Sequence, residues 1–156
     1  MREVDRGDAE MILKLYDLRR ESELRKARNF IMNFEPKSVD NVKAIVSYTH
    51  PENAHFRQVT SYWAMVADFA TRGILHPEMF AAHCGEAIWI FTKFEPLLPQ
   101  IRAEISPTFL ANIEAAIKSH PAVEKKAAMF RDMMAKMAAQ APAAPAAKAA
   151  KKKPKK

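Results

Sequence analysis

The stretch from Phe56 to Phe94 constrains the fold of this chain most strongly, because its pattern is typical of two apolar helices joined by a tight corner. Gly73 follows a run of apolar residues at helical spacing, and a glycine just past a helix readily takes the positive φ that ends it. Ile74 is then expected to fold back as the hydrophobic contact of that helix end. Pro77 suits the first position of the next helix, where its missing N–H is no loss. The stretch therefore predicts a helical hairpin whose first apolar face comprises Val59, Tyr62, Trp63, Val66, Phe69 and Ala70.

Residues 77–94 predict a single central helix of the bundle, because apolar side chains cover most of its circumference. Polar residues interrupt this run, which is too short for the roughly 20 apolar residues of a membrane span. Gly85 falls in the middle of the predicted helix, where glycine costs about 1 kcal/mol relative to alanine. We expect the close approach of a neighbouring helix or of a bulky ring, that of Trp63 or Trp89, to offset this cost.

The overall composition favours an all-α fold. The chain has 3 glycines in 156 residues and no alternating runs rich in Val, Ile and Thr. Its single cysteine, Cys84, excludes an internal disulfide and a zinc site built from several cysteines. Residues 1–8 are charged and show no apolar signal segment, so we expect a reducing, cytoplasmic location.

The remaining helices are predicted from capping residues and prolines. A long first helix is expected to start at Asp5 or Asp8 and to run to about Phe34, with Glu21 and Arg25 as an i,i+4 ion pair. Pro96 is expected to kink the predicted central helix or to start a new helix. The result is a five- to six-helix antiparallel bundle, whose other helices begin at Ser38, Pro51, Pro107 and Pro121.

The polar face of the first helix carries many basic residues. We expect it to be a solvated surface of mixed sign, because acids alternate with the bases along it. The alternative is a phosphate-binding basic patch, against which the interleaved acids argue. This face consists of Arg19, Arg20, Glu21, Glu23, Arg25, Lys26 and Arg28.

The last 18 residues differ in composition from the rest of the chain. Residues 139–156 contain alanine, proline and lysine without any acid, and removing their six lysines from the net charge of +7 leaves +1 for residues 1–138. Nothing in this segment can be buried in a core, so we expect a helical domain over 1–138 and a disordered tail over 139–156. The tail resembles the basic arms of nucleic-acid-associated proteins, and its cations are Lys148, Lys151, Lys152, Lys153, Lys155 and Lys156.

The tail allows three interpretations. Its lysines can bind nucleic acid without sequence preference, and such binding would weaken steeply with salt. They can also contact anionic lipid or acidic proteins. The third interpretation is a tail that only keeps the protein soluble.

The order of aromatic and capping residues in the hairpin resembles a family of small, all-helical bacterial proteins known only as a domain of unknown function. The resemblance covers residues 52–105 and consists mostly of packing and capping residues. It implies an all-helical fold and a bacterial source, and it brings no activity with it. The residues that carry it are Phe56, Arg57, Tyr62, Trp63, Gly73, Ile74, Leu75, Met79, Phe80, Trp89, Pro96, Ile101 and Arg102.

His83 and Glu86 are the candidate polar groups of the apolar helix, together with His76 two turns earlier. Di-iron bundles repeat a Glu-x-x-His motif on two helices, whereas this chain has one reversed copy, so we expect no metal and no cofactor. We expect instead that Glu86 forms a buried polar pair with Arg57 or Arg102, because a buried carboxylate needs a partner.

Catalytic motifs are not found in the sequence. Cys84 is expected to be a small core thiol, because His83 is adjacent to it and points about 100° away on a helix. A glycine-rich phosphate loop, G-x-S-x-G and H-E-x-x-H are all missing. We therefore expect that the protein is not an enzyme.

Methionines crowd the last predicted helix. They either fill the core or form an adaptable surface for a partner helix or a second copy of the chain. The sequence thus predicts a small helical binding or scaffold protein without a catalytic site; the alternative is a nucleic-acid-associated protein tethered through its tail. The methionines in question are Met129, Met133, Met134 and Met137.

Overall fold

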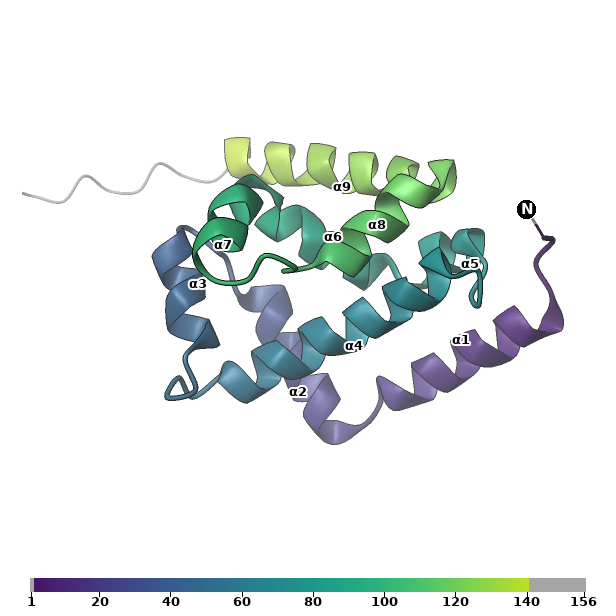
Figure 1. Cartoon of the computed structure of the whole chain (residues 1–156), viewed down its shortest axis with the longest axis horizontal. Helices are drawn as coiled ribbons and strands as arrows, with labels where there is room; N and C mark the ends of the chain where they lie inside the picture. Colours follow the sequence, from purple (N-terminus) through teal and green to yellow (C-terminus); the bar gives the residue numbers. More distant parts are fainter. Residues whose placement is uncertain (1, 141–156) are drawn as a thin grey trace, which may run out of the picture.

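A computed structural model of the chain describes residues 2–140, and in this range all regular structure is helical, as the sequence predicted (Figure 1). The tail residues 141–156, and with them the predicted tail lysines, lie outside the described residues. Within residues 2–140, no helix combines the length and the apolar character needed to cross a membrane. In chain order the helices are α1 (Arg6–Leu18), α2 (Ser22–Asn33), α3 (Val39–Val46), α4 (Asn53–Thr71), α5 (Pro77–His83), α6 (Gly85–Phe94), the 3₁₀ turn η1 (Glu95–Leu97), α7 (Leu98–Glu104), α8 (Ala111–Ser119) and α9 (Pro121–Gln140).

Helix α4 crosses the middle of the molecule and organises the packing (Figure 1). It contacts α2, α3, α5, α6 and α8, while α9 covers the outer side of α5, α6 and α8. The side chains of Val59, Trp63 and Val66 on α4 are almost completely buried. The prediction that residues 77–94 form the central helix is therefore wrong, and the first half of the hairpin takes that place.

Four phenylalanines join the elements at one end of the core. The ring centroid of Phe94 lies 6.2 Å from that of Phe34, 6.1 Å from that of Phe56 and 5.4 Å from that of Phe109. These rings come from α6, from the end of α2, from α4 and from the segment before α8. One of these contacts is stacked and two are edge-to-face, and such aromatic contacts add to the free energy gained by burial alone.

The expected long first helix is broken after Leu18. The Glu21 carboxylate accepts hydrogen bonds from the backbone N–H groups of Glu23 at 3.0 Å and Leu24 at 2.8 Å, which caps α2. The predicted ion pair of Glu21 with Arg25 is wrong for the same reason, since the carboxylate is occupied by the cap. The break changes the helix direction, so that α1 packs on α5 and α2 packs on α4.

The helix expected over 77–94 is also broken, at Cys84. This residue has φ −109° and ψ 31°, so α5 ends before it and α6 begins after it. Gly85 is consequently the first residue of α6 and does not lie mid-helix. The ring that approaches it belongs to Phe130 of α9, whose Cζ lies 3.5 Å from the position of a Cβ at Gly85. Neither Trp63 nor Trp89 takes that role.

Several helix boundaries predicted from capping residues are confirmed, and two are wrong. Asp5 and Ser38 cap α1 and α3. Pro51 lies two residues before α4 instead of at its first position. Helix α8 begins at Ala111 and not at Pro107, because Leu110 takes a positive φ of 54° immediately before it.

Gly73 forms the corner between α4 and α5 as predicted, with φ 71°. The backbone N–H groups of Ile74 and Leu75 both donate to the Phe69 carbonyl oxygen, at 2.9 and 3.0 Å. The inner contact is made by Leu75, which is 0% exposed, whereas Ile74 is 50% exposed. The expectation that Ile74 folds back into the core is wrong by one residue. The side chain that folds back belongs to Leu75, whose N–H group is also bonded to the end of α4.

Replacing Gly73 with alanine is expected to lower the free energy of unfolding by about 1–2 kcal/mol, the cost of a left-handed conformation for a residue with a Cβ. No heavy atom lies within 4 Å of the added Cβ, so the loss reports backbone strain alone. Urea unfolding measures it. Gly85→Ala is the matched control, since Gly85 lacks a positive φ and a Cβ there makes ordinary contacts. Equal losses in the two variants would contradict the assignment of strain to Gly73.

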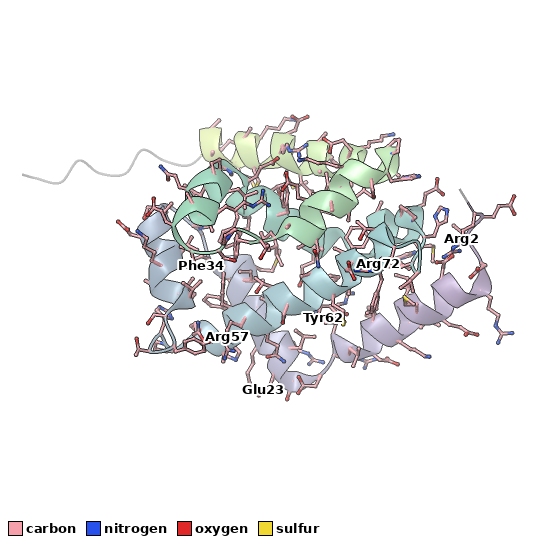
Figure 2. The ribbon with its side chains drawn as sticks, viewed as in Figure 1. Arg2, Glu23, Phe34, Arg57, Tyr62 and Arg72 are labelled. Atoms are coloured by element: carbon pink, nitrogen blue, oxygen red, sulfur yellow. The ribbon has the colours of Figure 1, made fainter. Side chains whose placement is uncertain are left out.

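The N-terminus is fastened to the same corner through Asp8, which is 1% exposed. The Arg2 guanidinium donates to both Asp8 carboxylate oxygens at 2.6 Å, and the His76 backbone N–H donates to one of them at 2.7 Å. The Asp5 N–H donates to the other at 3.0 Å. In Figure 2, Arg2 lies beside α5, next to the start of α1. One carboxylate thus joins the first residues, α1 and the corner after α4.

Candidate functional site

Glu86, in the first turn of α6, is paired with Arg28 of α2. Its carboxylate accepts two hydrogen bonds from Arg28 Nε, at 2.9 and 3.0 Å, and one from Arg28 Nη2 at 2.7 Å. It also accepts the indole N–H of Trp63 at 2.9 Å. The positive end of the α6 dipole favours a carboxylate in this position. Glu86 therefore joins α2, α4 and α6.

The predicted pairing of Glu86 with Arg57 or Arg102 is wrong. Arg57 lies near the start of α4, where its Nε donates to Asn53 Oδ1 at 2.9 Å and its guanidinium lies 5.0 Å from the Tyr48 ring centroid (Figure 2). Arg102 forms an ion pair of 2.6 Å with Glu114. The Glu86 carboxylate is partly buried and does have an arginine partner, but the predicted partner is wrong, because the partner depends on how α2 packs across α4.

Arg19 follows the end of α1 and is stacked between two aromatic rings. Its guanidinium carbon lies 5.2 Å from the Tyr16 ring centroid and 5.5 Å from the Trp63 ring centroid. Its Nε is buried and has no hydrogen-bond partner among the described residues. The stacked rings hold the guanidinium in place, while the hydrogen-bonding capacity of its Nε is unused.

A cleft of about 460 Å³ opens at the corner between α1 and α2. We call it the basic cleft, and its lining residues are Tyr16, Arg19, Arg20, Arg25 and Arg28. In the described part of the chain Arg28 is the one lining arginine with an ion-pair partner, Glu86. The acids that alternate with these arginines in sequence are engaged elsewhere: Glu21 caps α2, and Glu23 pairs with Lys26 at 2.7 Å.

A second cavity of about 220 Å³ adjoins the basic cleft, with Tyr16 and Arg19 lining both. We call it the apolar cavity. His83 contributes an imidazole to its wall, and most other lining side chains are apolar. The remaining lining residues are Ile12, Leu15, Trp63, Ala82 and Cys84. The corner between α1 and α2 therefore has a cationic side and an apolar side, separated by the stacked guanidinium of Arg19.

Cys84 and Tyr62 lie close to this site but remain protonated at neutral pH. Burial raises the pKa of the Cys84 thiol to about 12 and that of the Tyr62 hydroxyl to about 12. The Tyr62 hydroxyl donates to the Leu15 carbonyl oxygen at 2.8 Å. A thiol is a nucleophile only as the thiolate, so burial leaves Cys84 inert.

The histidines of the predicted polar cluster are separated in the structure. His76 caps α5 by accepting the Glu78 N–H at its Nδ1, and its Nε2 lies 2.9 Å from the Arg2 carbonyl oxygen. His83 instead lines the apolar cavity. Among residues 2–140, no group of three or more His, Cys, Asp and Glu side chains is placed to hold a metal ion.

The methionines of α9 lie mainly at the surface. Met129, Met133 and Met137 are exposed, so core filling is wrong for these three. Met134 is partly buried and lines, with Met137 and Trp89, a cleft of about 500 Å³. The role of this surface in binding a partner remains a prediction, as does the role of the tail lysines, which lie outside the described residues.

The arginines of the basic cleft lie on the face of the first predicted helix for which the sequence predicted a solvated surface of mixed sign. The signal that supports a binding site was present, since Tyr16, Arg19, Arg20, Arg25 and Arg28 lie within 13 residues of one another. Three acids in the same stretch, Asp17, Glu21 and Glu23, obscured it. Only the caps and ion pairs of the folded chain show that these acids do not neutralise Arg19, Arg20 and Arg25.

The fold and the site define an all-helical domain with a basic cleft at the corner of its first two helices. The chain belongs to the family described as Domain of unknown function (DUF4760), whose model matches residues 6–119. The resemblance seen in residues 52–105 is thereby confirmed and extended to α1, α2, α3 and α8. No curated protein and no solved structure matches the chain.

Proposed function

We propose that this domain is a binding protein that takes an anionic ligand in the basic cleft and catalyses no reaction of its own. The observation that carries the proposal is the set of three arginines that have no carboxylate partner within residues 2–140. Arg19, Arg20 and Arg25 repel one another across the basic cleft, and an anion placed between them would relieve that repulsion. Guanidinium groups bind carboxylate and phosphate oxygens with two parallel hydrogen bonds, which adds specificity to the attraction.

Arg19 is the best prepared of the three for a ligand. Its stacking between Tyr16 and Trp63 restricts the side chain before a ligand arrives. A side chain that is already ordered loses less conformational entropy on binding. Arg28 is ordered as well, through Glu86, and its charge is balanced there. The cleft thus combines one fixed and uncompensated guanidinium with two exposed ones.

The groups around the cleft support binding rather than catalysis. The buried thiol of Cys84 is protonated, and the phenol of Tyr62 is engaged with a backbone carbonyl oxygen. His83 lines the apolar cavity and is not among the residues that line the basic cleft. A scaffold role of the exposed α9 methionines is compatible with this proposal, because α9 lies on the opposite side of α4 from α1 (Figure 1).

The test is a calorimetric titration of the full chain with pyrophosphate at fixed ionic strength. The double variant R20Q/R25Q is expected to bind about tenfold more weakly than the unmodified chain, a loss of about 1.4 kcal/mol. Both arginines are exposed, so the substitutions should leave the fold intact.

The matched control is K152Q/K153Q, which removes the same charge from the tail. It is expected to bind pyrophosphate within twofold of the unmodified chain. Equal weakening in the two double variants would indicate a general effect of net charge, and weakening in K152Q/K153Q alone would place the anion on the tail; either result would refute the cleft as its site. A chain that does not bind pyrophosphate at all would also refute it.

A further inference from the structure

The apolar cavity beside the basic cleft has no part in binding a simple anion. Its volume is about 220 Å³. A dry cavity of about 150 Å³, engineered into another protein, is large enough to bind benzene. The cavity in this chain therefore has room for one ring or for a short branched chain, and not for a long lipid tail.

We propose that the ligand is an amphipathic anion, namely a phosphate or carboxylate that carries one small aromatic or branched apolar group. The proposal rests on the proposed function, because it assigns the head group to the basic cleft and the apolar group to the adjoining cavity. Tyr16 and Arg19 line both spaces, so a single small molecule on Arg19 can reach each of them.

The walls of the apolar cavity fit such a group. Trp63 is almost completely buried and forms part of the wall, and its indole N–H is held by Glu86, so the ring cannot turn to donate to a ligand. Ile12 and Leu15 come from α1, and Ala82 comes from α5. Burial of a ring against these side chains removes apolar surface from water, which favours binding.

The Arg19 guanidinium gives the ligand a fixed orientation. It lies between the rings of Tyr16 and Trp63, with its Nε buried and without a partner in the described residues. An anionic oxygen on the cleft side meets the free N–H groups of the guanidinium, and the attached apolar group then points past Tyr16 into the cavity. A ligand bound in the opposite orientation would bury its charge among apolar side chains, which is strongly unfavourable.

The experiment compares phenyl phosphate with methyl phosphate, two anions with the same head group, by titration of the full chain. Phenyl phosphate is expected to bind at least tenfold more tightly. The variant A82F should abolish this preference and leave the affinity for methyl phosphate unchanged. Ala82 is exposed and lines the cavity, so a phenyl side chain there can occupy the space without displacing the core.

The matched control is A115F, which adds the same ring to an exposed alanine of α8 outside the cavity, and it should keep the preference. If A82F does not fold, a second measurement on the unmodified chain takes its place. Nuclear Overhauser effects are then expected between phenyl phosphate and the Trp63 ring or the Ile12 methyl groups, and their absence refutes the inference. Equal affinity for the two phosphates refutes the amphipathic ligand and leaves the proposed function standing. If phenyl phosphate, methyl phosphate and pyrophosphate all fail to bind, the proposed function is refuted as well.

Discussion

Replacement of Glu86 with alanine is expected to lower the free energy of unfolding by about 2–4 kcal/mol, because it leaves a partly buried guanidinium and a buried indole N–H without their acceptor. Arg28 and Trp63 together donate four hydrogen bonds to this carboxylate. The Arg28 side chain is 28% exposed, so water partly compensates its loss, and the expected value lies below that of a fully buried pair. Chemical denaturation measures the change.

Two further variants show which part of the Glu86 interaction matters. Glu86→Gln keeps an acceptor for the Trp63 indole but removes the charge, so its loss should be intermediate. In a double-mutant cycle, Glu86→Ala combined with Arg28→Met should cost less than the sum of the two single variants, because the unpaired guanidinium is then absent. Strict additivity in that cycle would show that the pair contributes no coupling energy and would overturn this explanation.

Asp8→Asn is expected to lower the free energy of unfolding by roughly 1–3 kcal/mol at neutral pH. The amide loses the charge-assisted hydrogen bonds with Arg2, and its NH2 group is placed against donors of Arg2, Asp5 and His76. The control is Asp40→Asn, an exposed aspartate whose Lys43 partner lies 3.7 Å away. Asp40→Asn should change the free energy of unfolding very little, since exposed ion pairs contribute little to stability. Equal losses in the two variants would contradict a special role of Asp8.

The loss in Asp8→Asn should depend on pH. The Arg2 guanidinium, assisted by the Asp5 and His76 N–H groups, holds the pKa of the Asp8 carboxyl well below its ordinary value of 3.8, although burial acts in the opposite direction. A carboxyl whose pKa is lower in the folded state than in the unfolded state stabilises the fold fully at pH values above its unfolded-state pKa. This stabilisation is lost as the pH falls toward the folded-state pKa. The difference between the two proteins should therefore be constant above about pH 5 and should narrow below about pH 4. A difference that stays the same down to pH 3 would refute the assignment.

The corner between α4 and α5 shows how far sequence reasoning reaches. Gly73, Pro77 and the apolar spacing before them predicted α4, the turn and the start of α5, because glycine and proline act through the local backbone. The same local chemistry predicted Ser38 as the cap of α3 and either Asp5 or Asp8 as the cap of α1, and the cap of α1 is Asp5. The continuous helices over 5–34 and 77–94 were wrong, since helical spacing persists across a break if the cap or the packing changes only the direction of the chain.

The candidate site shows which features of this protein the sequence does not predict. The residues of the basic cleft are close in sequence, but Arg19 is completed by Trp63 and Arg28 by Glu86, which lie on other helices. The sequence also suggested that acids neutralise these arginines. In the structure, Glu21 is held by the backbone of α2 and Glu23 by Lys26. Which charges meet depends on rotamers and caps that no spacing rule predicts.

The sequence by itself determined the all-helical class of this DUF4760 protein, the corner at Gly73 and the starts of α1, α3, α5 and α9, because each of these depends on the backbone preferences of a few neighbouring residues. The tertiary structure alone decided that α4 is the central helix, that Glu86 meets Arg28 instead of Arg57, and that three arginines have no carboxylate partner in the described part of the chain. The physical reason is that packing and charge pairing are settled between residues far apart in the chain. Their free energies depend on distance and burial, which only the folded molecule has.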